Sequence, residues 1–273
     1  MNNYQQQSIH KTEGASDAGP SCNLCGSFEF KPFVERWGLR VVRCENCGLA
    51  FTHPRPEEIA SQYDEDYFGL YARRSKFRHR RMAGRLQNIE TLVPPGRVLD
   101  IGCSLGYFLE VAAQFGWEPH GIDISKYAAD FCTKSGFNVK AGTLEDTDFA
   151  DDYFDCVTMW DTLEHVTDPT DHMHEVRRIL RPGGLVVIGT PDVAHPAFRI
   201  KKSEWRHLKP AEHLYYFSRS TINRLLEKTG FKPVQPSLRN ASGLSQVSAV
   251  LRQLAGRTVR LNDVLIAYGE KLS

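Results

Sequence analysis

From about residue 97 onward, short apolar runs alternate with longer amphipathic segments. Runs rich in apolar and β-branched residues predict buried strands at RVLDI (97–101), EPHGIDI (118–124), FNVKA (137–141), FDCVTMW (154–160) and GLVVIGT (184–190). Helix-like segments occupy 106–116, 125–136, 169–184 and 219–230, and two further strands are expected at 230–238 and 262–271. This alternation is typical of an α/β, Rossmann-like fold with a mostly parallel sheet of seven strands.

The pattern changes before residue 97 and divides the chain. Residues 1–20 are polar and rich in Gly, Ser and Gln, so we expect a disordered tail. Residues 21–52 form a small strand-rich unit, and 53–96 are expected to be a helical linker that ends at VPPG. The large domain spans 97–273, with a lid insertion expected at about 191–217 because that segment is long, aromatic and irregular.

Two cysteine pairs of identical spacing, CNLCG and CENCG, lie in the small unit. A C-x2-C turn lets two thiolates reach one ion, and the following glycine permits a tight turn. A disulfide or a redox pair does not account for two matched turns. We therefore expect a zinc ribbon, and a structural role for the ion because all four ligand positions are filled. The ligands would be Cys22, Cys25, Cys44 and Cys47.

Composition restricts the functional classes. The formal net charge is only +1, which argues mildly against a dedicated nucleic-acid binder. A basic cluster at 73–81 is expected to lie around a solvated helix, with contact to an anionic substrate as the alternative. The chain has no apolar run of membrane-spanning length and no apolar core of a secretory signal, so we expect a cytoplasmic protein with reduced cysteines.

The stretch VLDIGCSLGYFLE (98–110) places an acid and two glycines after the first strand of the large domain. Neither the dinucleotide pattern G-x-G-x-x-G nor a P-loop is present. Asp100 would repel a polyphosphate but suits a ligand that carries an ammonium group. Gly102 and Gly106 let the backbone approach a flat, bulky ligand.

A second acid, Asp123, ends the second strand of that domain in HGIDIS. A carboxylate at this place accepts hydrogen bonds from two ribose hydroxyls. A ligand with a ribose and a cation, but no need for phosphate, describes S-adenosylmethionine.

With these motifs, residues 97–271 resemble the class I S-adenosylmethionine-dependent methyltransferases. VLDIGCSLGYFL is similar to the family's first motif, GIDIS to its ribose-binding motif, and RILRPGGLVVIGTP to the turn into its fifth strand. Ser104 stands where the family usually has glycine, and it is small enough to keep the loop. Glu145, or the backbone beside it, is expected to receive the adenine amino group, and Trp160 to pack on the adenine. The expected cofactor-binding residues are Asp100, Gly102, Ser104, Gly106, Asp123, Ile124, Glu145 and Trp160.

The segment WDTLEHV follows the fourth strand, where the catalytic groups of this fold belong. It resembles the E-x-x-E-H segment of ubiquinone-biosynthesis O-methyltransferases, which is linked to a divalent metal. The resemblance implies that Asp161, Glu164 and His165 hold Mg²⁺, which would acidify a hydroxyl. Two alternatives stay open: His165 is a metal-free general base, or Glu164 and His165 only position the loop.

A second histidine-rich segment, WRHLKPAEHLYYFSRS, lies at 205–220. EHLYYFS resembles a recurrent element of a bacterial subgroup that also has the zinc ribbon and is often associated with tailoring of small molecules, sugars or polysaccharides. His213 is the second candidate for a catalytic or substrate-positioning base, with Tyr215 and Tyr216 shaping the pocket. The alternative is a packed aromatic loop. The only reason to consider His207 as a base is that it lies close to His213 in the sequence.

Three functions are compatible with these features. The first is methyl transfer to a small-molecule acceptor, at a hydroxyl oxygen of a sugar-, polyketide- or quinol-like substrate. The second is methylation of rRNA or tRNA, with the zinc ribbon gripping RNA, although the N/D-P-P-[FY] motif of base-methylating enzymes is absent. The third is a non-catalytic cofactor-binding protein. The candidate bases favour an enzyme.

Overall fold

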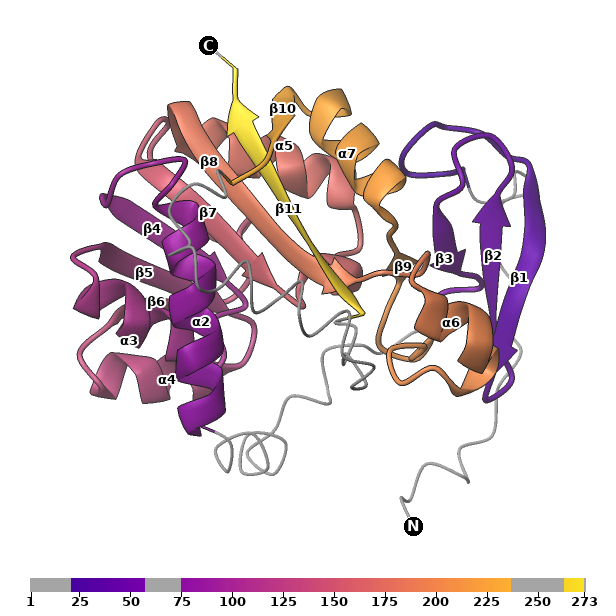
Figure 1. The fold of residues 1–273 in the computed structure, drawn as a ribbon, viewed down its shortest axis with the longest axis horizontal. Coiled ribbons are helices and arrows are strands. Elements are labelled where there is room, and N and C mark those ends of the chain that lie inside the picture. The colour runs from indigo at the N-terminus through magenta and orange to yellow at the C-terminus, as the bar shows by residue number, and fades with distance from the viewer. Residues whose placement is uncertain (1–20, 57–74, 237–262, 273) are drawn as a thin grey trace, which may run out of the picture.

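A seven-stranded sheet forms the centre of this computed structural model, which describes residues 21–56, 75–236 and 263–272 (Figure 1). The strands follow the order β10-β11-β8-β7-β4-β5-β6. Pairing is parallel from β8 to β6, and β11 is antiparallel to both its neighbours. The predicted α/β fold is confirmed. The strands are β4 (Arg97–Ile101), β5 (Glu118–Asp123), β6 (Asn138–Ala141), β7 (Phe154–Trp160), β8 (Leu180–Pro191), β10 (Phe231–Val234) and β11 (Val264–Lys271).

Alternate side chains of the central strands enter two cores, one on each face of the sheet. Val98 and Cys156 face one core, whereas Leu99 and Val157 face the other. The helices α2 (Ser75–Ile89) and α3 (Tyr107–Gln114) cover the first core, and α5 (Pro169–Ile179) and α7 (Arg219–Lys228) cover the second (Figure 1). Another helix, α4 (Lys126–Lys134), packs on β5 and β6. The loops at the carboxyl ends of the strands are left to build a site.

The helix expected at 169–184 is shorter in the structure. Helix α5 ends at Ile179, and strand β8 begins at Leu180. Arg181 precedes Pro182, and a residue before proline is pushed out of the helical region towards extended backbone. The proline therefore ends the helix earlier than its hydrophobic pattern suggests.

The four-cysteine unit contains β1 (Phe30–Arg36), β2 (Leu39–Cys44) and β3 (Ala50–Thr52), paired antiparallel. A fourth strand, β9 (Tyr215–Tyr216), completes this second sheet and comes from the segment between β8 and α7. Phe51 pairs with Tyr215. The same segment carries α6 (Pro196–Lys201) and the 3-10 turn η3 (Lys202–Glu204), within the insertion expected at 191–217. In Figure 1 the unit lies beside α6 and α7.

Some expectations fall outside the described residues. These are the tail at 1–20 and, within the linker, residues 57–74, which include Arg73 and Arg74 of the basic cluster. The described remainder of the linker contains α2. Across the described ranges we find no helix with the length and apolar character needed to cross a membrane.

Candidate functional site

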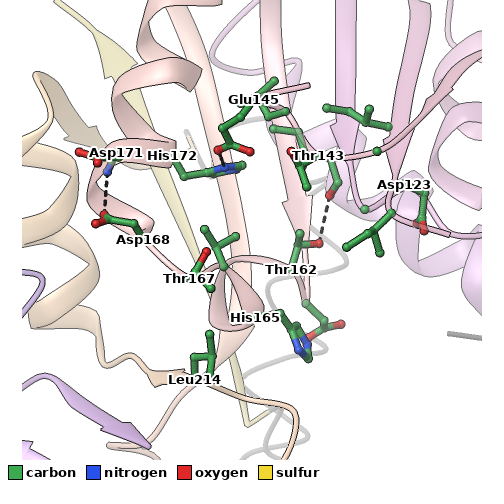
Figure 2. Close-up of a pocket in the computed structure, with 18 of the residues that line it drawn as sticks. Asp123, Thr143, Glu145, Thr162, His165, Thr167, Asp168, Asp171, His172 and Leu214 are labelled. Carbon is green, nitrogen blue, oxygen red and sulfur yellow. Dashed lines mark hydrogen bonds and ion pairs between the residues drawn. The ribbon is translucent and has the colours of Figure 1, made fainter. Parts of the chain in front are cut away.

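A cavity of about 710 Å³ opens at the carboxyl ends of β4, β5 and β7. Its volume falls in the range of small-molecule and cofactor sites. Figure 2 shows Asp123 on one side of it and Asp168 and Asp171 on the other. Six of the eight residues expected to hold the cofactor line the cavity: Gly102, Ser104, Asp123, Ile124, Glu145 and Trp160.

The loop after β4 has the shape that its glycines allow. Gly102 has φ 76°, and a Cβ there would lie 2.5 Å from Thr162 Oγ1, so both conformation and space require glycine. Ser104 also adopts a left-handed conformation, with φ 52°. Its backbone N–H donates to Asp123 Oδ2 at 2.8 Å. Gly106, with φ 77°, caps α3 and lies outside the cavity lining. The loop is thus tied to the acid that ends β5.

Asp100 lies under this loop, beside the cavity-lining Ile101, and is almost fully buried. Its Oδ1 accepts a hydrogen bond from Thr158 Oγ1 at 2.6 Å. Burial raises the pKa of Asp100 to about 7, and the nearby charge of Asp123 adds to the rise. A carboxyl group with its pKa near 7 is partly protonated at neutral pH, and a cationic ligand beside it stabilises the ionised form.

Glu145 and His172 lie next to each other at the upper edge of the cavity in Figure 2. His172 Nδ1 and Glu145 Oε1 are 2.9 Å apart, and this hydrogen bond lowers the pKa of Glu145. The carboxylate that was expected to receive the adenine amino group therefore already has an imidazole partner. The cavity reaches this pair from Ile124 through Thr143 and Leu144.

Arg85 is a residue that the sequence did not single out. It lies on α2, is 5% exposed, and its guanidinium stacks 4.2 Å above the Trp160 ring. Burial lowers its pKa to about 10, while Asp161 and Asp100 attract its charge. A basic residue inside the apolar face of an amphipathic helix, beside Met82 and Leu86, was the available signal.

Glu164, His165 and His213 come together from η2 (Leu163–His165) and the segment before β9. Each offers a ligand atom, and these atoms lie within 4.8 Å of one another. The two imidazole rings meet edge to face at 4.8 Å. The structure therefore joins both candidate bases, whereas Asp161, expected beside Glu164 and His165 in a metal site, lies outside this group.

The tautomer of His165 follows from its backbone carbonyl partner, which can only accept. His165 Nδ1 lies 2.9 Å from the Glu212 carbonyl, so Nδ1 carries the proton and Nε2 is the unprotonated nitrogen. The Nδ1 atom of His213 is buried without a hydrogen-bond partner among the described residues. Burial lowers the pKa of both imidazoles. Both are therefore neutral acceptors at neutral pH.

Two carboxylic acids lie beside these rings. Glu164 Oε2 accepts from Thr190 Oγ1 at 2.9 Å, and Oε1 has no partner within the described part of the chain. Burial and the charge of Asp161 raise the pKa of Glu164 to about 8. Asp161 has φ 57° and lines the cavity. Asp161 therefore gives this end of the cavity an affinity for cations, whereas Glu164 is buried outside the cavity lining.

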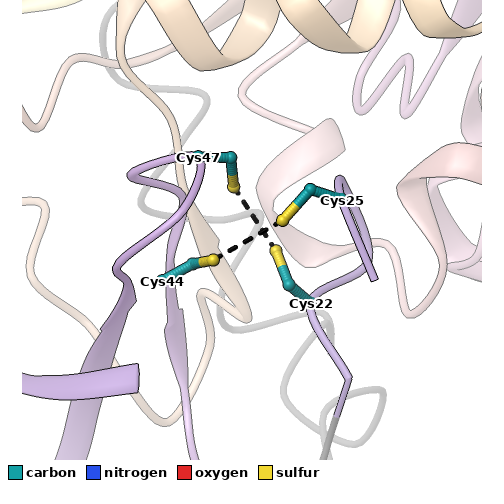
Figure 3. Close-up of side chains that lie close together, drawn as sticks. All are labelled: Cys22, Cys25, Cys44 and Cys47. Carbon is teal, nitrogen blue, oxygen red and sulfur yellow. Dashed lines mark hydrogen bonds between the residues drawn. The ribbon is translucent and has the colours of Figure 1, made fainter. Parts of the chain in front are cut away.

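The four cysteine side chains converge (Figure 3). The Cys22 and Cys47 sulfurs are 3.5 Å apart, the Cys25 and Cys44 sulfurs 3.6 Å, and all four lie within 4.8 Å of one another. Four cysteine sulfurs at these mutual distances match the ligand set of a structural zinc site, so the donor set fits a tetrahedral zinc ion.

A family model described as a methyltransferase domain matches residues 74–236, more than half of the chain. The chain belongs to this methyltransferase family, and its fold is that of the class I enzymes that use S-adenosylmethionine. A methyltransferase from Thermotoga maritima described as a possible histamine N-methyltransferase aligns with TM-score 0.54 and 22% identity, over 76% of this chain and 97% of that one. A second methyltransferase, from Archaeoglobus fulgidus, aligns with TM-score 0.54 and 23% identity, over 76% of this chain and 100% of that one. At sequence identities of 22% and 23%, these alignments show a shared fold and say nothing about the substrate.

Curated relatives match the large domain. An uncharacterised protein of Methanocaldococcus jannaschii is 30% identical over 153 residues, which are 55% of this chain and 71% of that protein. A ubiquinone biosynthesis O-methyltransferase of Alkalilimnicola ehrlichii is 36% identical over 101 residues, 34% of this chain and 41% of the relative. Another ubiquinone biosynthesis O-methyltransferase, from Cereibacter sphaeroides, is 31% identical over 153 residues, which are 50% of this chain and 61% of that protein. The chain thus spans about half the length of these two O-methyltransferases.

Proposed function

We propose that this enzyme transfers the methyl group of S-adenosylmethionine to a hydroxyl oxygen of a small-molecule acceptor. The observation that carries the proposal is the neutral His165, whose Nδ1–H is held by the Glu212 carbonyl and whose Nε2 is the basic nitrogen. Such a base accepts the hydroxyl proton as the oxygen attacks the methyl group. The similarity to ubiquinone biosynthesis O-methyltransferases supports oxygen as the nucleophile.

The cavity suggests how the cofactor lies. We place the ribose on Asp123, the adenine between Ile124 and Glu145, and the methionine half against Trp160, all of which line the cavity. Arg85 stacks on Trp160 from outside the cavity lining, so it holds the Trp160 ring in place and is not assigned a contact with the cofactor. Since one face of the Trp160 ring is thereby covered, this placement differs from the adenine contact that the sequence suggested for it.

Replacing Asp123 by asparagine is expected to weaken S-adenosylmethionine binding roughly tenfold to a hundredfold, because charged acceptors for the ribose hydroxyls are lost. Calorimetric titration of the cofactor measures the change. Asp130→Asn is the matched control, because it removes the same charge from an exposed position on α4. Equal affinities of Asp123→Asn and wild type would contradict the placement of the ribose.

The affinity for S-adenosylmethionine is expected to rise as pH rises, because Asp100 becomes ionised. Burial raises the pKa of this group to about 7, so the folded protein binds its proton between about pH 4 and pH 7. Its contribution to stability is therefore present at low pH and lost as pH rises through 7. A cationic cofactor favours the ionised form, so affinity should rise roughly five- to tenfold between pH 6 and pH 7.5, with proton release. Calorimetry in buffers of different ionisation enthalpy tests this, and Asp100→Asn should abolish the dependence.

The predicted Mg²⁺ ligands are Asp161, Glu164 and His165, but the atoms that converge belong to Glu164, His165 and His213. Two imidazoles and one carboxylate suit a borderline transition metal better than Mg²⁺, which prefers oxygen ligands. We therefore propose His165 as a general base without routing the reaction through a metal. Activity that survives chelators selective for divalent ions supports this choice, and loss of activity restored by Mg²⁺ would favour the original hypothesis.

We further propose that Cys22, Cys25, Cys44 and Cys47 hold a structural Zn²⁺. The converging sulfurs support this assignment. The ion would bind the two turns of the small unit together, and no coordination position would be left open for chemistry.

The decisive experiment offers the enzyme two classes of acceptor. Purified protein is incubated with S-adenosylmethionine labelled at the methyl group, and with a panel of catechols, phenols and sugars on one side and total tRNA and rRNA on the other. Label in a small hydroxylated compound supports the proposal. Label only in RNA would replace it by nucleic-acid methylation, and cofactor binding with no transfer to either class would favour a binding protein.

A further inference from the structure

Next to the pairing of β3 with β9, Thr52 of the four-cysteine unit binds the backbone of His213, one of the candidate catalytic histidines. Thr52 ends β3 and is 1% exposed. Its Oγ1 donates to the His213 carbonyl at 2.8 Å, and its backbone N–H donates to the Leu214 carbonyl at 2.9 Å. One residue of the small unit thus binds two successive carbonyls of the segment that carries His213.

The other side of the same segment is bound to η2. The Leu214 N–H donates to the Glu164 carbonyl at 2.8 Å, and His165 Nδ1 donates to the Glu212 carbonyl. The backbone of residues 212–214 is therefore held between Thr52 and the turn that bears Glu164 and His165. Each of these bonds lies in a buried or half-buried setting, where a lost partner costs more than at the surface.

The ring of His213 is packed against two other rings, His165 and, at 6.0 Å, Tyr216 of β9. It is 5% exposed and meets the His165 ring edge to face at 4.8 Å. Its Nδ1 has no hydrogen-bond partner among the described residues, so the direction of the ring is set by these ring contacts and by the backbone of its own segment. A shift of this backbone would move the ring against His165.

We propose that Thr52 is a positioning residue for methyl transfer, through which the four-cysteine unit fixes His213 against the base His165. The inference rests on the proposed function for the role of His165. It gives the amino-terminal unit a place in the active site of a small-molecule enzyme. Because the hydroxyl of Thr52 supplies one specific bond, its effect is separable from the general stability of the sheet.

The test compares Thr52→Val, which keeps the shape and removes the hydroxyl, with Thr52→Ser, which restores it. Thr229→Val is the matched control: Thr229 is also 1% exposed, and its Oγ1 donates to the Leu225 carbonyl at 2.8 Å in α7. Ring nitrogen signals of His213 and His165 are recorded by NMR in the full chain with S-adenosylhomocysteine. Turnover is measured with a catechol as the probe acceptor.

We expect Thr52→Val to shift the ring signals of both histidines and to lower kcat about tenfold, with cofactor affinity within twofold of wild type. Thr52→Ser should restore the signals, and Thr229→Val should leave them unchanged. Unchanged signals in Thr52→Val, or equal shifts in Thr229→Val, would overturn the inference.

Two further observations keep the outcomes distinct. In wild-type protein alone, the Thr52 hydroxyl proton should exchange slowly with water, and fast exchange counts against the bond even where Thr52→Val does not fold. If Thr52→Val shifts the histidine signals but the wild-type protein methylates no hydroxylated acceptor, the proposed function fails. The structural link between Thr52 and the histidines then still stands.

Discussion

Cys44→Ser is expected to abolish binding of the proposed zinc ion and to lower the melting temperature by roughly 10 °C or more. Structural zinc sites contribute many kcal/mol to folding, and about 1 kcal/mol corresponds to several degrees in a domain of this size. Cys44 is 1% exposed and belongs to the same core as Leu214 and Tyr215, so the damage should reach the segment that carries His213. Metal analysis and thermal unfolding measure the two effects.

The chain provides a matched control for this change. Cys132 is also 1% exposed, but it lies on α4 outside the group of four cysteines. Cys132→Ser should therefore retain one zinc per chain and lose little stability by comparison. If Cys44→Ser kept its full zinc content, the assignment of the four-cysteine site would be wrong.

His165→Gln is expected to lower kcat by about 10²- to 10⁴-fold, the range that general bases contribute. Cofactor affinity should stay within a few-fold of wild type, because the ring lies at the acceptor end of the cavity. Single-turnover assays with a hydroxylated acceptor that wild type methylates separate the two quantities.

The pH dependence of wild type provides a second measurement of the same group. Burial lowers the pKa of His165 below its ordinary value of 6.5, so the acidic limb of kcat should lie below that pH. His174→Gln is the control, since this histidine is exposed on α5. A loss of cofactor binding equal to the loss of kcat would assign His165 to binding and not to proton transfer.

The sequence predicted the large domain well because its signals are local. Strands of alternating apolar residues, glycines with positive φ and acids at strand ends are each specified by a few neighbouring positions. Gly102 and Asp123 accordingly lie where the motifs placed them, at the rim of the cavity. The two cysteine turns could also be predicted, because a C-x2-C spacing by itself brings two thiolates within reach of one ion.

Contacts between distant segments were not predicted. Nothing in the order of residues shows that Thr52 bonds the carbonyl of His213, or that Arg85 of α2 stacks on Trp160 of β7. The metal hypothesis around Asp161 followed from the resemblance of WDTLEHV to an E-x-x-E-H segment, whereas the structure has a 3-10 turn there, and Asp161 adopts a left-handed conformation just before it. A change of a few backbone angles redirects a side chain, and spacing rules cannot anticipate it.

The pairing of β3 with β9 has a consequence for how the protein matures. During synthesis the cysteine turns emerge early, but their sheet retains an open edge at Ala50–Thr52 until Tyr215 and Tyr216 have left the ribosome. An unpaired edge of this kind is a template for wrong partners. Early capture of an ion by the two turns would keep that nascent edge short and ordered while the remainder of the polypeptide is made.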